Sequence, residues 1–248
     1  MTARPGSAQR DPILGRVADY PFPVDASLRR RLERCIDLEG KLLRTLDALG
    51  PIAGRDVVLV DADGELRSRQ LAARGARVVA LAPGTGTATS RRRPPVGLAT
   101  GSVTRTGGTL LDNRLPAGSA DVVVSFWSSF RGGSDAEVSA AERLLRPGGR
   151  VLAVHEYGRD DLSRLWPEER ARELVSWSRR DGWFLGHDFK IRVVHAFWTF
   201  PDLDALREVA AAVAGARVDG LLANVRRPRL SWKVVVYHRS SEVAATGA

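Results

Sequence analysis

The sequence predicts a doubly wound α/β fold, in which helices cover a mostly parallel sheet and an antiparallel strand pair lies near the C-terminus. Apolar stretches with the length of buried strands recur at residues 57–61, 77–81, 121–126 and 150–155. Helical segments separate these stretches, which is the alternation that parallel strands require. The C-terminal third is rich in β-branched and aromatic residues, so the antiparallel pair is expected there.

The length of 248 residues suits one α/β domain with a large core. We expect a flexible N-terminus over residues 1–24, a single domain over 25–239 and a disordered tail over 240–248. No apolar run is long enough to span a bilayer, and no signal-peptide core is visible near the N-terminus. Cys35 is the only cysteine, so a disulfide framework is excluded. A cytoplasmic protein without membrane association is the expectation.

The first half begins with apolar residues at three- and four-residue steps over 28–49, which predict one amphipathic helix ended by Gly50-Pro51. A strand, a tight turn, a helix over 66–74 and a second strand follow. Residues 82–108 are rich in Gly, Thr, Arg and Pro with little periodicity. Because a structureless loop of this length is unusual in a compact domain, the structure of that segment stays open.

Regular patterns return in the second half. A strand over 121–127 is followed by a helix that ends at a Pro-Gly-Gly turn, and then by another buried strand. The further segments alternate between helix and strand. They are a helix over 135–145, a strand over 150–155, a helix over 168–181, a β-rich stretch over 189–200, a helix over 202–214 and a strand over 231–238.

Three segments resemble matching parts of the class I S-adenosylmethionine-dependent methyltransferases: residues 54–79, 115–123 and 141–152. The third match is specific, because it joins a helix, the turn Pro147-Gly148-Gly149 and a buried strand. The resemblance covers roughly residues 50–240 and implies a Rossmann-like methyltransferase fold with S-adenosylmethionine as cofactor. It places cofactor contacts at Asp61, Ala62, Asp63, Gly64, Ala82, Gly108, Thr109 and Ser125.

The departures from the family pattern fall on these same positions. The loop glycines correspond to Asp61, Asp63 and Glu65, and the two downstream acids correspond to Ala82 and Thr109. A methyl group cannot accept the charge-assisted hydrogen bonds of a ribose, each worth about 1.5–3 kcal/mol. A carboxylate ~4 Å from the cofactor's own carboxylate costs about 4 kcal/mol at an effective dielectric of ~20. Asp61 or Asp63 could instead face the cofactor's ammonium or sulfonium.

His155, Glu156 and Tyr157 are the candidate catalytic residues, because they end a predicted strand at the edge where α/β folds place active sites. A His or Glu there could serve as general base toward a methyl acceptor. A polar strand end near solvent is the alternative interpretation. The C-terminal tryptophans, from Trp166 to Trp232, are explained by core and lid packing or by an aromatic acceptor pocket.

The formal net charge is +9 and comes almost entirely from arginine. Residues 91–93 and 226–229 are the densest basic clusters, and neither has the interleaved aromatic residues of a single-strand stacking site. Weak, non-specific nucleic-acid binding is therefore the most that this charge predicts. Residues 61–65 match a calcium loop poorly, so no metal is expected.

Two functions remain open. The favoured one is a methyltransferase-like protein with an eroded cofactor site, weak or no catalysis, and a binding or scaffold role toward a small-molecule or protein partner. The alternative is an active methyltransferase with an atypical pocket that acts on a small molecule or RNA.

Overall fold

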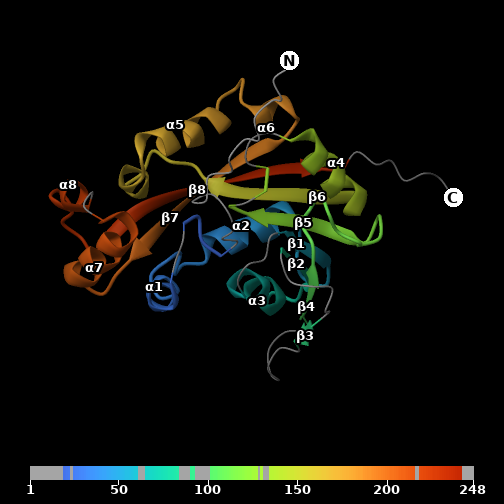
Figure 1. Ribbon diagram of the computed structural model, residues 1–248, viewed down its shortest axis with the longest axis horizontal. Coiled ribbons are helices and arrows are strands. Elements are labelled where there is room, and N and C mark those ends of the chain that lie inside the picture. Colours follow the sequence, from blue (N-terminus) through green and yellow to red (C-terminus); the bar gives the residue numbers. More distant parts are fainter. Residues whose placement is uncertain are drawn as a thin grey trace, which may run out of the picture.

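The computed structural model describes residues 19–22, 25–60, 65–83, 90–92, 101–127, 129–130, 134–215 and 218–241; for residues 90–92 and 221 only the backbone is described. Within these ranges eight strands form one sheet in the order β3-β4-β2-β1-β5-β6-β8-β7 (Figure 1). The strands are β1 (Asp56–Val60), β2 (Arg77–Ala82), β3 (Ser90–Arg92), β4 (Ser102–Gly107), β5 (Ala120–Phe126), β6 (Leu145–Glu156), β7 (Lys190–Thr199) and β8 (Arg229–Ser240).

The central strands run parallel, as predicted. β1 pairs with β2 and β5, β2 pairs with β4, and β5 pairs with β6, all in parallel. The antiparallel C-terminal pair is also confirmed, because β8 inserts between β6 and β7 and is antiparallel to both. Residues 57–60 of β1 are buried on both faces of the strand, which explains their continuous apolar run.

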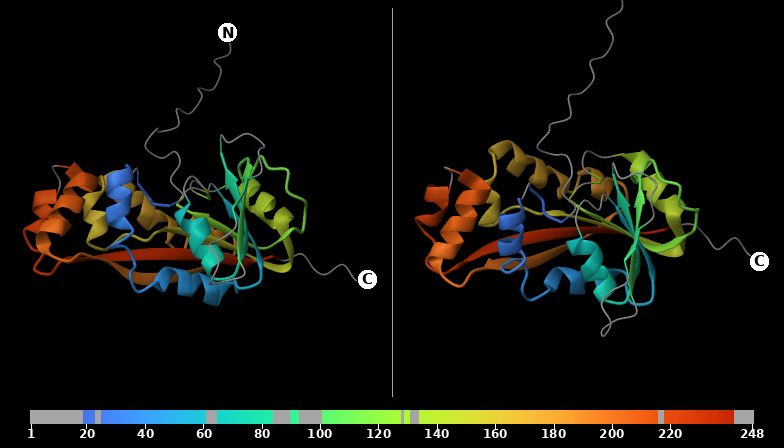
Figure 2. Two further views of the ribbon diagram at one scale, coloured as in Figure 1. Left: turned by 90° about the horizontal axis from the view of Figure 1, so that it is seen from below. Right: turned by 60° about the horizontal axis from the view of Figure 1, so that its bottom comes forward.

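Helices cover both faces of the sheet, and in Figure 2 α2 and α5 lie on opposite sides of the long C-terminal strands. α7 and α8 lie at the β7 end of the molecule, far from β3 and β4 (Figure 1). The helices are α1 (Ala26–Leu32), α2 (Lys41–Leu49), α3 (Leu66–Ala73), α4 (Asp135–Leu144), the 3₁₀ helix η1 (Leu162–Leu165), α5 (Glu168–Trp177), α6 (Trp183–Gly186), α7 (Leu203–Ala214) and α8 (Val218–Leu222).

The single helix predicted over residues 28–49 is wrong, because the chain forms α1 and α2 with a turn between them. Asp37 has a positive φ of 47° and Gly40 has a φ of 63°, so the backbone leaves the helical region there. The Asp37 carboxylate then accepts hydrogen bonds from the backbone N–H groups of Lys41 and Leu42, both at 2.9 Å. It caps α2 from outside the helix, a role that apolar spacing does not reveal.

Residues 102–107 of the segment that had no recognisable pattern form the strand β4. Its sequence, Ser-Val-Thr-Arg-Thr-Gly, is mostly polar and half-exposed. It nevertheless pairs with β2 over six residues, from Arg77↔Ser102 to Ala82↔Gly107. Gly101, just before it, lets the chain pass close to α3, because a Cβ at that position would lie 2.0 Å from the Ala72 carbonyl oxygen. Packing against β2, and not hydrophobic periodicity, makes this strand.

We predict that Gly101→Ala lowers the free energy of unfolding by about 1–3 kcal/mol, because the clashing atom belongs to backbone and cannot rotate away. Urea unfolding monitored by circular dichroism measures the change. Gly186→Ala is the matched control, since nothing lies within 4 Å of a Cβ built there. Equal stability of the two variants would contradict this account of the β4 entry.

Candidate functional site

The carboxyl ends of the parallel strands lie at one edge of the sheet. The order in which strands are added reverses between β1 and β5. From β1 the sheet grows through β2 and β4 on one side and through β5 and β6 on the other. In open α/β sheets this switch point forms the crevice that receives ligands. In folds of this kind, the helix that follows the first strand points its N-terminal N–H groups at that crevice. We therefore name the space at the ends of β1 and β5 the switch-point crevice.

Asp61, Ala62, Asp63 and Gly64, the predicted cofactor loop after β1, lie outside the described residues. The described part of the crevice begins at α3. Its first N–H groups are satisfied by a residue from far along the chain: Asp19 accepts hydrogen bonds from the backbone N–H groups of Leu66 at 3.4 Å and Arg67 at 3.2 Å. The Asp19 residue is only 2% exposed. The positive end of this helix thus already holds a carboxylate of the chain itself.

Arg67 places a buried cation beside Asp19. Its Nε and one terminal nitrogen donate to the Asp19 carbonyl oxygen at 3.2 and 3.0 Å, and the other terminal nitrogen donates to Gln70 at 2.9 Å. The guanidinium carbon lies 5.0 Å from the Phe126 ring and 6.0 Å from the Trp127 ring, at the end of β5. Burial lowers the pKa of Arg67, and Asp19 acts in the opposite direction. The crevice wall is therefore cationic and aromatic.

Residues 19–22 are held from two sides. Arg67 binds the carbonyl of Asp19, and Arg170 of α5 donates to the carbonyl of Pro21 at 2.6 Å. Phe22 packs between Trp166 and Trp198, with ring centroids 5.4 and 5.6 Å away. The sequence places these residues in a flexible N-terminus, whereas the side chains of Tyr20 and Phe22 are part of the hydrophobic core. The rest of that predicted terminus, residues 1–18 and 23–24, lies outside the described residues, as does most of the predicted tail.

The other predicted cofactor residues have local structural roles. Ala82 ends β2 as a buried methyl group, and Ser125 accepts a hydrogen bond from the Ser129 N–H at 3.1 Å. Gly108 has a φ of 122°, and a Cβ there would lie 2.4 Å from the Asp112 carbonyl oxygen. The Thr109 hydroxyl accepts from the Asp112 N–H at 3.0 Å. Gly108 and Thr109 thus shape the turn after β4.

The candidate catalytic residues do not converge, because neighbours on a strand point to opposite faces. Glu156 is 5% exposed; one of its oxygens accepts from Trp166 Nε1 at 2.9 Å, and the other pairs with Arg170. Burial raises the pKa of Glu156, and Arg170 opposes that shift. With both oxygens engaged, this carboxylate anchors α5 and is poorly placed to serve as a general base.

His155 faces the other side of β6 and is 2% exposed. Its ring lies against Trp177 at 5.1 Å, Phe184 at 5.7 Å and Tyr237 at 6.3 Å between centroids. Tyr157, the third candidate, is half-buried and donates its backbone N–H to Lys233. The strand end is therefore packed, and the expectation of a polar end near solvent is not met for His155.

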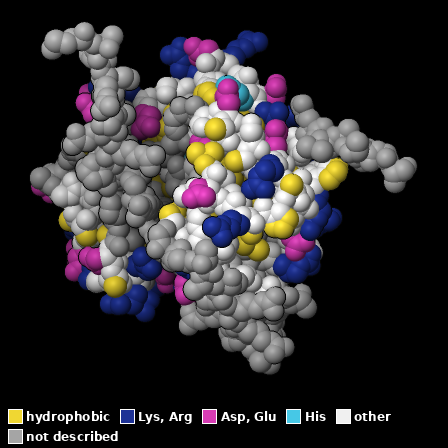
Figure 3. Space-filling model, turned by 45° about the vertical axis from the view of Figure 1, so that its right-hand side comes forward, with side chains coloured by type: hydrophobic (Ala, Val, Ile, Leu, Met, Phe, Trp, Pro, Cys, Tyr) yellow, Lys and Arg dark blue, Asp and Glu magenta, His cyan; other side chains and the backbone are white. Residues whose placement is uncertain are grey.

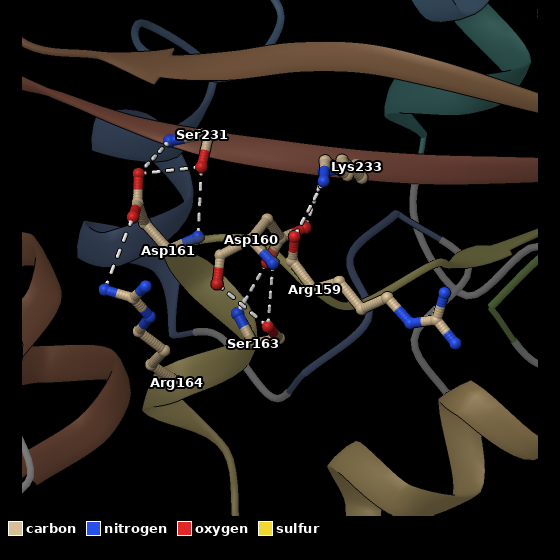
Figure 4. Close-up of polar contacts among 7 residues, drawn as sticks. All are labelled: Arg159, Asp160, Asp161, Ser163, Arg164, Ser231 and Lys233. Carbon is tan, nitrogen blue, oxygen red and sulfur yellow. Dashed lines mark hydrogen bonds and ion pairs between the residues drawn. The ribbon is translucent and has the colours of Figure 1, made fainter.

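Two adjacent carboxylates after β6 also look like an acid-base pair, but each is tied to backbone (Figure 4). Asp160 accepts from the N–H groups of Ser163 at 2.7 Å and Lys233 at 2.6 Å. Asp161 accepts from the N–H and the hydroxyl of Ser231 at 2.9 and 2.7 Å. Burial raises the pKa of Asp160. The pair fastens the β6–η1 turn to β8 and so fixes the strand end that carries Glu156.

Comparison with solved structures gives the fold a name. A protein from Anaeromyxobacter dehalogenans, provisionally assigned as a type II methyltransferase, superposes with a TM-score of 0.52 over 80% of this chain and 94% of its own, at 18% identity. The chain has the fold of a class I S-adenosylmethionine-dependent methyltransferase. Geranyl diphosphate methyltransferase, solved with S-adenosylmethionine, matches over 92% of this chain and 94% of its own at 17% identity, with a TM-score of 0.46.

No family model and no curated protein matches the sequence. The match with a 16S rRNA (adenine(1408)-N(1))-methyltransferase from Catenulisporales acidiphilia is of the same kind, with 18% identity, coverage of 86% and 99%, and a TM-score of 0.44. At 18% identity the match with the Anaeromyxobacter dehalogenans protein shows the fold alone, so the activity has to be argued from the site.

A metal site, a membrane span and a nucleic-acid site would each require particular features of the described residues. Among those residues, no three His, Cys, Asp or Glu side chains gather as metal ligands would. No described helix is both long and apolar enough to cross a membrane. Charges of both signs are interspersed over the face seen in Figure 3. In the basic cluster at residues 226–229, the Arg229 guanidinium lies 3.5 Å above the Phe197 ring.

We predict that Arg170→Met lowers the free energy of unfolding by about 3–5 kcal/mol at pH 7, because it leaves the buried Glu156 carboxylate without its cation. Burial already raises the folded-state pKa of Glu156, and the variant raises it further. The loss should be smallest below the unfolded pKa, where both states are protonated, and should grow as pH rises through the folded pKa. Urea unfolding at about pH 4 and about pH 8 measures it.

Arg172→Met is the matched control on the same helix, because that guanidinium is exposed and lies 3.8 Å from Glu168. It should change stability by less than about 0.5 kcal/mol. Adding Glu156→Gln to Arg170→Met should restore stability and remove its pH dependence. An Arg170→Met variant as stable as the parent at the higher pH would show that the pair does not anchor α5.

Proposed function

We propose that this chain is a binding protein built on the methyltransferase fold, with weak or absent S-adenosylmethionine-dependent catalysis. The observation that carries the proposal is the content of the switch-point crevice. Asp19 accepts hydrogen bonds from the first N–H groups of α3, and the Arg67 guanidinium lies 5.0 Å from the Phe126 ring at the end of β5. Both side chains are buried and hydrogen-bonded, so displacing either one would break hydrogen bonds and cost free energy.

The chemistry of these residues does not fit the cofactor. S-adenosylmethionine carries a carboxylate, which would compete with the Asp19 carboxylate for the same helix N-terminus. It also carries an ammonium and a sulfonium, which would be repelled by the buried Arg67 cation. The Asp19 carboxylate therefore already occupies the helix N-terminus that the ligand's carboxylate would need. The loss of a ribose acceptor at Ala82 acts in the same direction.

Titration calorimetry of the full chain with S-adenosylmethionine and S-adenosylhomocysteine tests the proposal. We expect dissociation constants in the millimolar range or no measurable heat, with the fold checked by thermal unfolding in the same buffer. A micromolar dissociation constant would overturn the proposal. The alternative, an active methyltransferase with an atypical pocket that acts on a small molecule or on RNA, would then be favoured.

Restoring the family residues at the altered positions should restore cofactor binding. Asp61→Gly with Asp63→Gly and Ala82→Asp restores two loop glycines and one ribose acceptor, so we predict that cofactor affinity rises at least about tenfold over the parent. The control replaces Ala82→Asp by Ala82→Asn, which has the same shape without the charge and should gain less. If a folded triple variant shows no gain, adding Asp19→Ala tests whether the crevice residues alone exclude the ligand.

We predict that nucleic-acid affinity is weak and vanishes as salt rises from about 50 to about 200 mM, because released counterions supply nearly all of it. Arg226 and Arg227 are exposed and are the described part of the basic clusters that can reach phosphates. Replacing both with Ala should weaken binding to every oligonucleotide alike in fluorescence anisotropy. Tight binding to one RNA that persists at high salt would instead make RNA the leading partner.

A further inference from the structure

We propose that the molecule has a second site, an aromatic pocket that binds an uncharged, planar aromatic molecule. The pocket lies between the end of α5, the start of α6 and the segment after β5, and its volume is about 400 Å³. Trp183 is its half-exposed ring, Phe130, Trp177 and Phe184 are buried behind the surface, and Arg179 and Asp181 lie at the rim. The inference goes beyond the proposed function, because binding there does not depend on whether the switch-point crevice takes a cofactor.

Trp183, the half-exposed wall, is fixed by His187. The two rings stack with centroids 4.3 Å apart and planes at 29°. The imidazole is in turn held at both nitrogens: Nδ1 lies 2.8 Å from the Trp183 carbonyl oxygen and Nε2 lies 2.9 Å from Asp135 of α4. One face of Trp183 is thus covered, and its ring plane is set before any ligand arrives.

The floor of the pocket is equally rigid. Phe184 stacks on Tyr237 of β8, with centroids 3.7 Å apart and planes at 1°. Trp177 meets the edge of His155 at 5.1 Å, so the histidine predicted as a catalytic base instead supports the pocket from behind. Phe130 is buried. Because second-layer rings hold Trp177 and Phe184, a ligand would lose little affinity to ordering them.

The rim selects against charge. Arg179 and Asp181 form a two-point ion pair, with Nε–Oδ1 at 2.9 Å and a terminal nitrogen–Oδ2 at 3.1 Å. One positive and one negative group cancel, so the pocket lining is neutral on a chain whose formal charge is +9. A charged ligand would lose hydration without gaining a free partner at this rim. An uncharged ligand has no such cost.

Size and shape complete the description of the ligand. A volume of about 400 Å³ falls within the range of about 300–1,000 Å³ typical of small-molecule sites. The half-exposed Trp183 ring favours a flat ligand, because aromatic rings gain from offset stacking and edge contacts that a saturated ring cannot make. The occupant that fits is therefore a neutral molecule of one to three fused aromatic rings.

Three probes with one carbon skeleton test the proposal: 2-naphthol is neutral and planar, naphthalene-2-sulfonate is planar and anionic, and decahydro-2-naphthol is neutral and saturated. Calorimetry of the full chain, without any methyltransferase cofactor, gives their affinities. We expect 2-naphthol to bind at least about tenfold more tightly than the other two. Equal binding of the saturated alcohol would show that the pocket does not distinguish aromatic from other apolar molecules. Tighter binding of the sulfonate would contradict the neutral rim. Either result overturns the proposal.

Variants place the binding. Trp183→Ala should weaken 2-naphthol about tenfold, whereas Trp183→Phe should retain most of the affinity. Leu111→Ala is the control, because Leu111 is a large apolar residue that is 59% exposed and belongs to the β4–β5 connection. Unchanged 2-naphthol binding in folded Trp183→Ala would refute the site.

A charge switch keeps the test valid even if that variant folds poorly. Asp181→Ala frees the Arg179 guanidinium, so naphthalene-2-sulfonate should gain affinity while 2-naphthol stays the same. An unchanged preference in Asp181→Ala would show that the rim does not control selection. Because no cofactor is present, micromolar binding of S-adenosylmethionine would overturn the proposed function and leave this inference standing.

Discussion

The contact between Asp19 and the N-terminus of α3 organises the functional end of this molecule. It satisfies the first N–H groups of the helix with a buried carboxylate and brings the carbonyl that Arg67 needs. A buried guanidinium is stable only where acceptors and aromatic faces surround it, and Asp19, Gln70 and Phe126 supply them. The aromatic residues that follow Asp19 then pack into the core. One interaction therefore joins residues 19–22 to the N-terminus of α3.

The parallel core could be predicted because its strands are buried on both faces, and such strands are continuous apolar runs like residues 57–60. β4 could not, since its polar residues become a strand through pairing with β2. The break between α1 and α2 was hidden for a related reason. Apolar spacing continues through it, while the deciding features are the positive φ of Asp37 and the bonds of its carboxylate. Such features depend on backbone geometry, which composition does not encode.

The site was harder to predict than the fold, because its residues come from distant parts of the chain. His155 and Glu156 are neighbours in sequence, yet the alternation of a strand sends one toward Trp177 and the other toward Arg170. Asp19 and Arg67 were missed entirely. A signal did exist for Arg67: it lies four residues before Leu71 on the face of α3 that is otherwise buried, where a charge needs a partner. The sequence alone does not say that the partner precedes it by 48 positions.

The place of β8 in the sheet has a consequence for how the protein is made. β6 and β7 are never hydrogen-bonded to each other; β8 lies between them and pairs with both along most of its length. Until the ribosome has synthesised residues 229–240, β7 has no neighbour in the sheet and β6 has an open edge. A nascent chain at that stage exposes one edge of β6, which is already paired with β5, and leaves β7 without a neighbouring strand. Synthesis of β8 then joins β7 to β6 in one late step. Before that step, the open strand edges are available for a chaperone to bind.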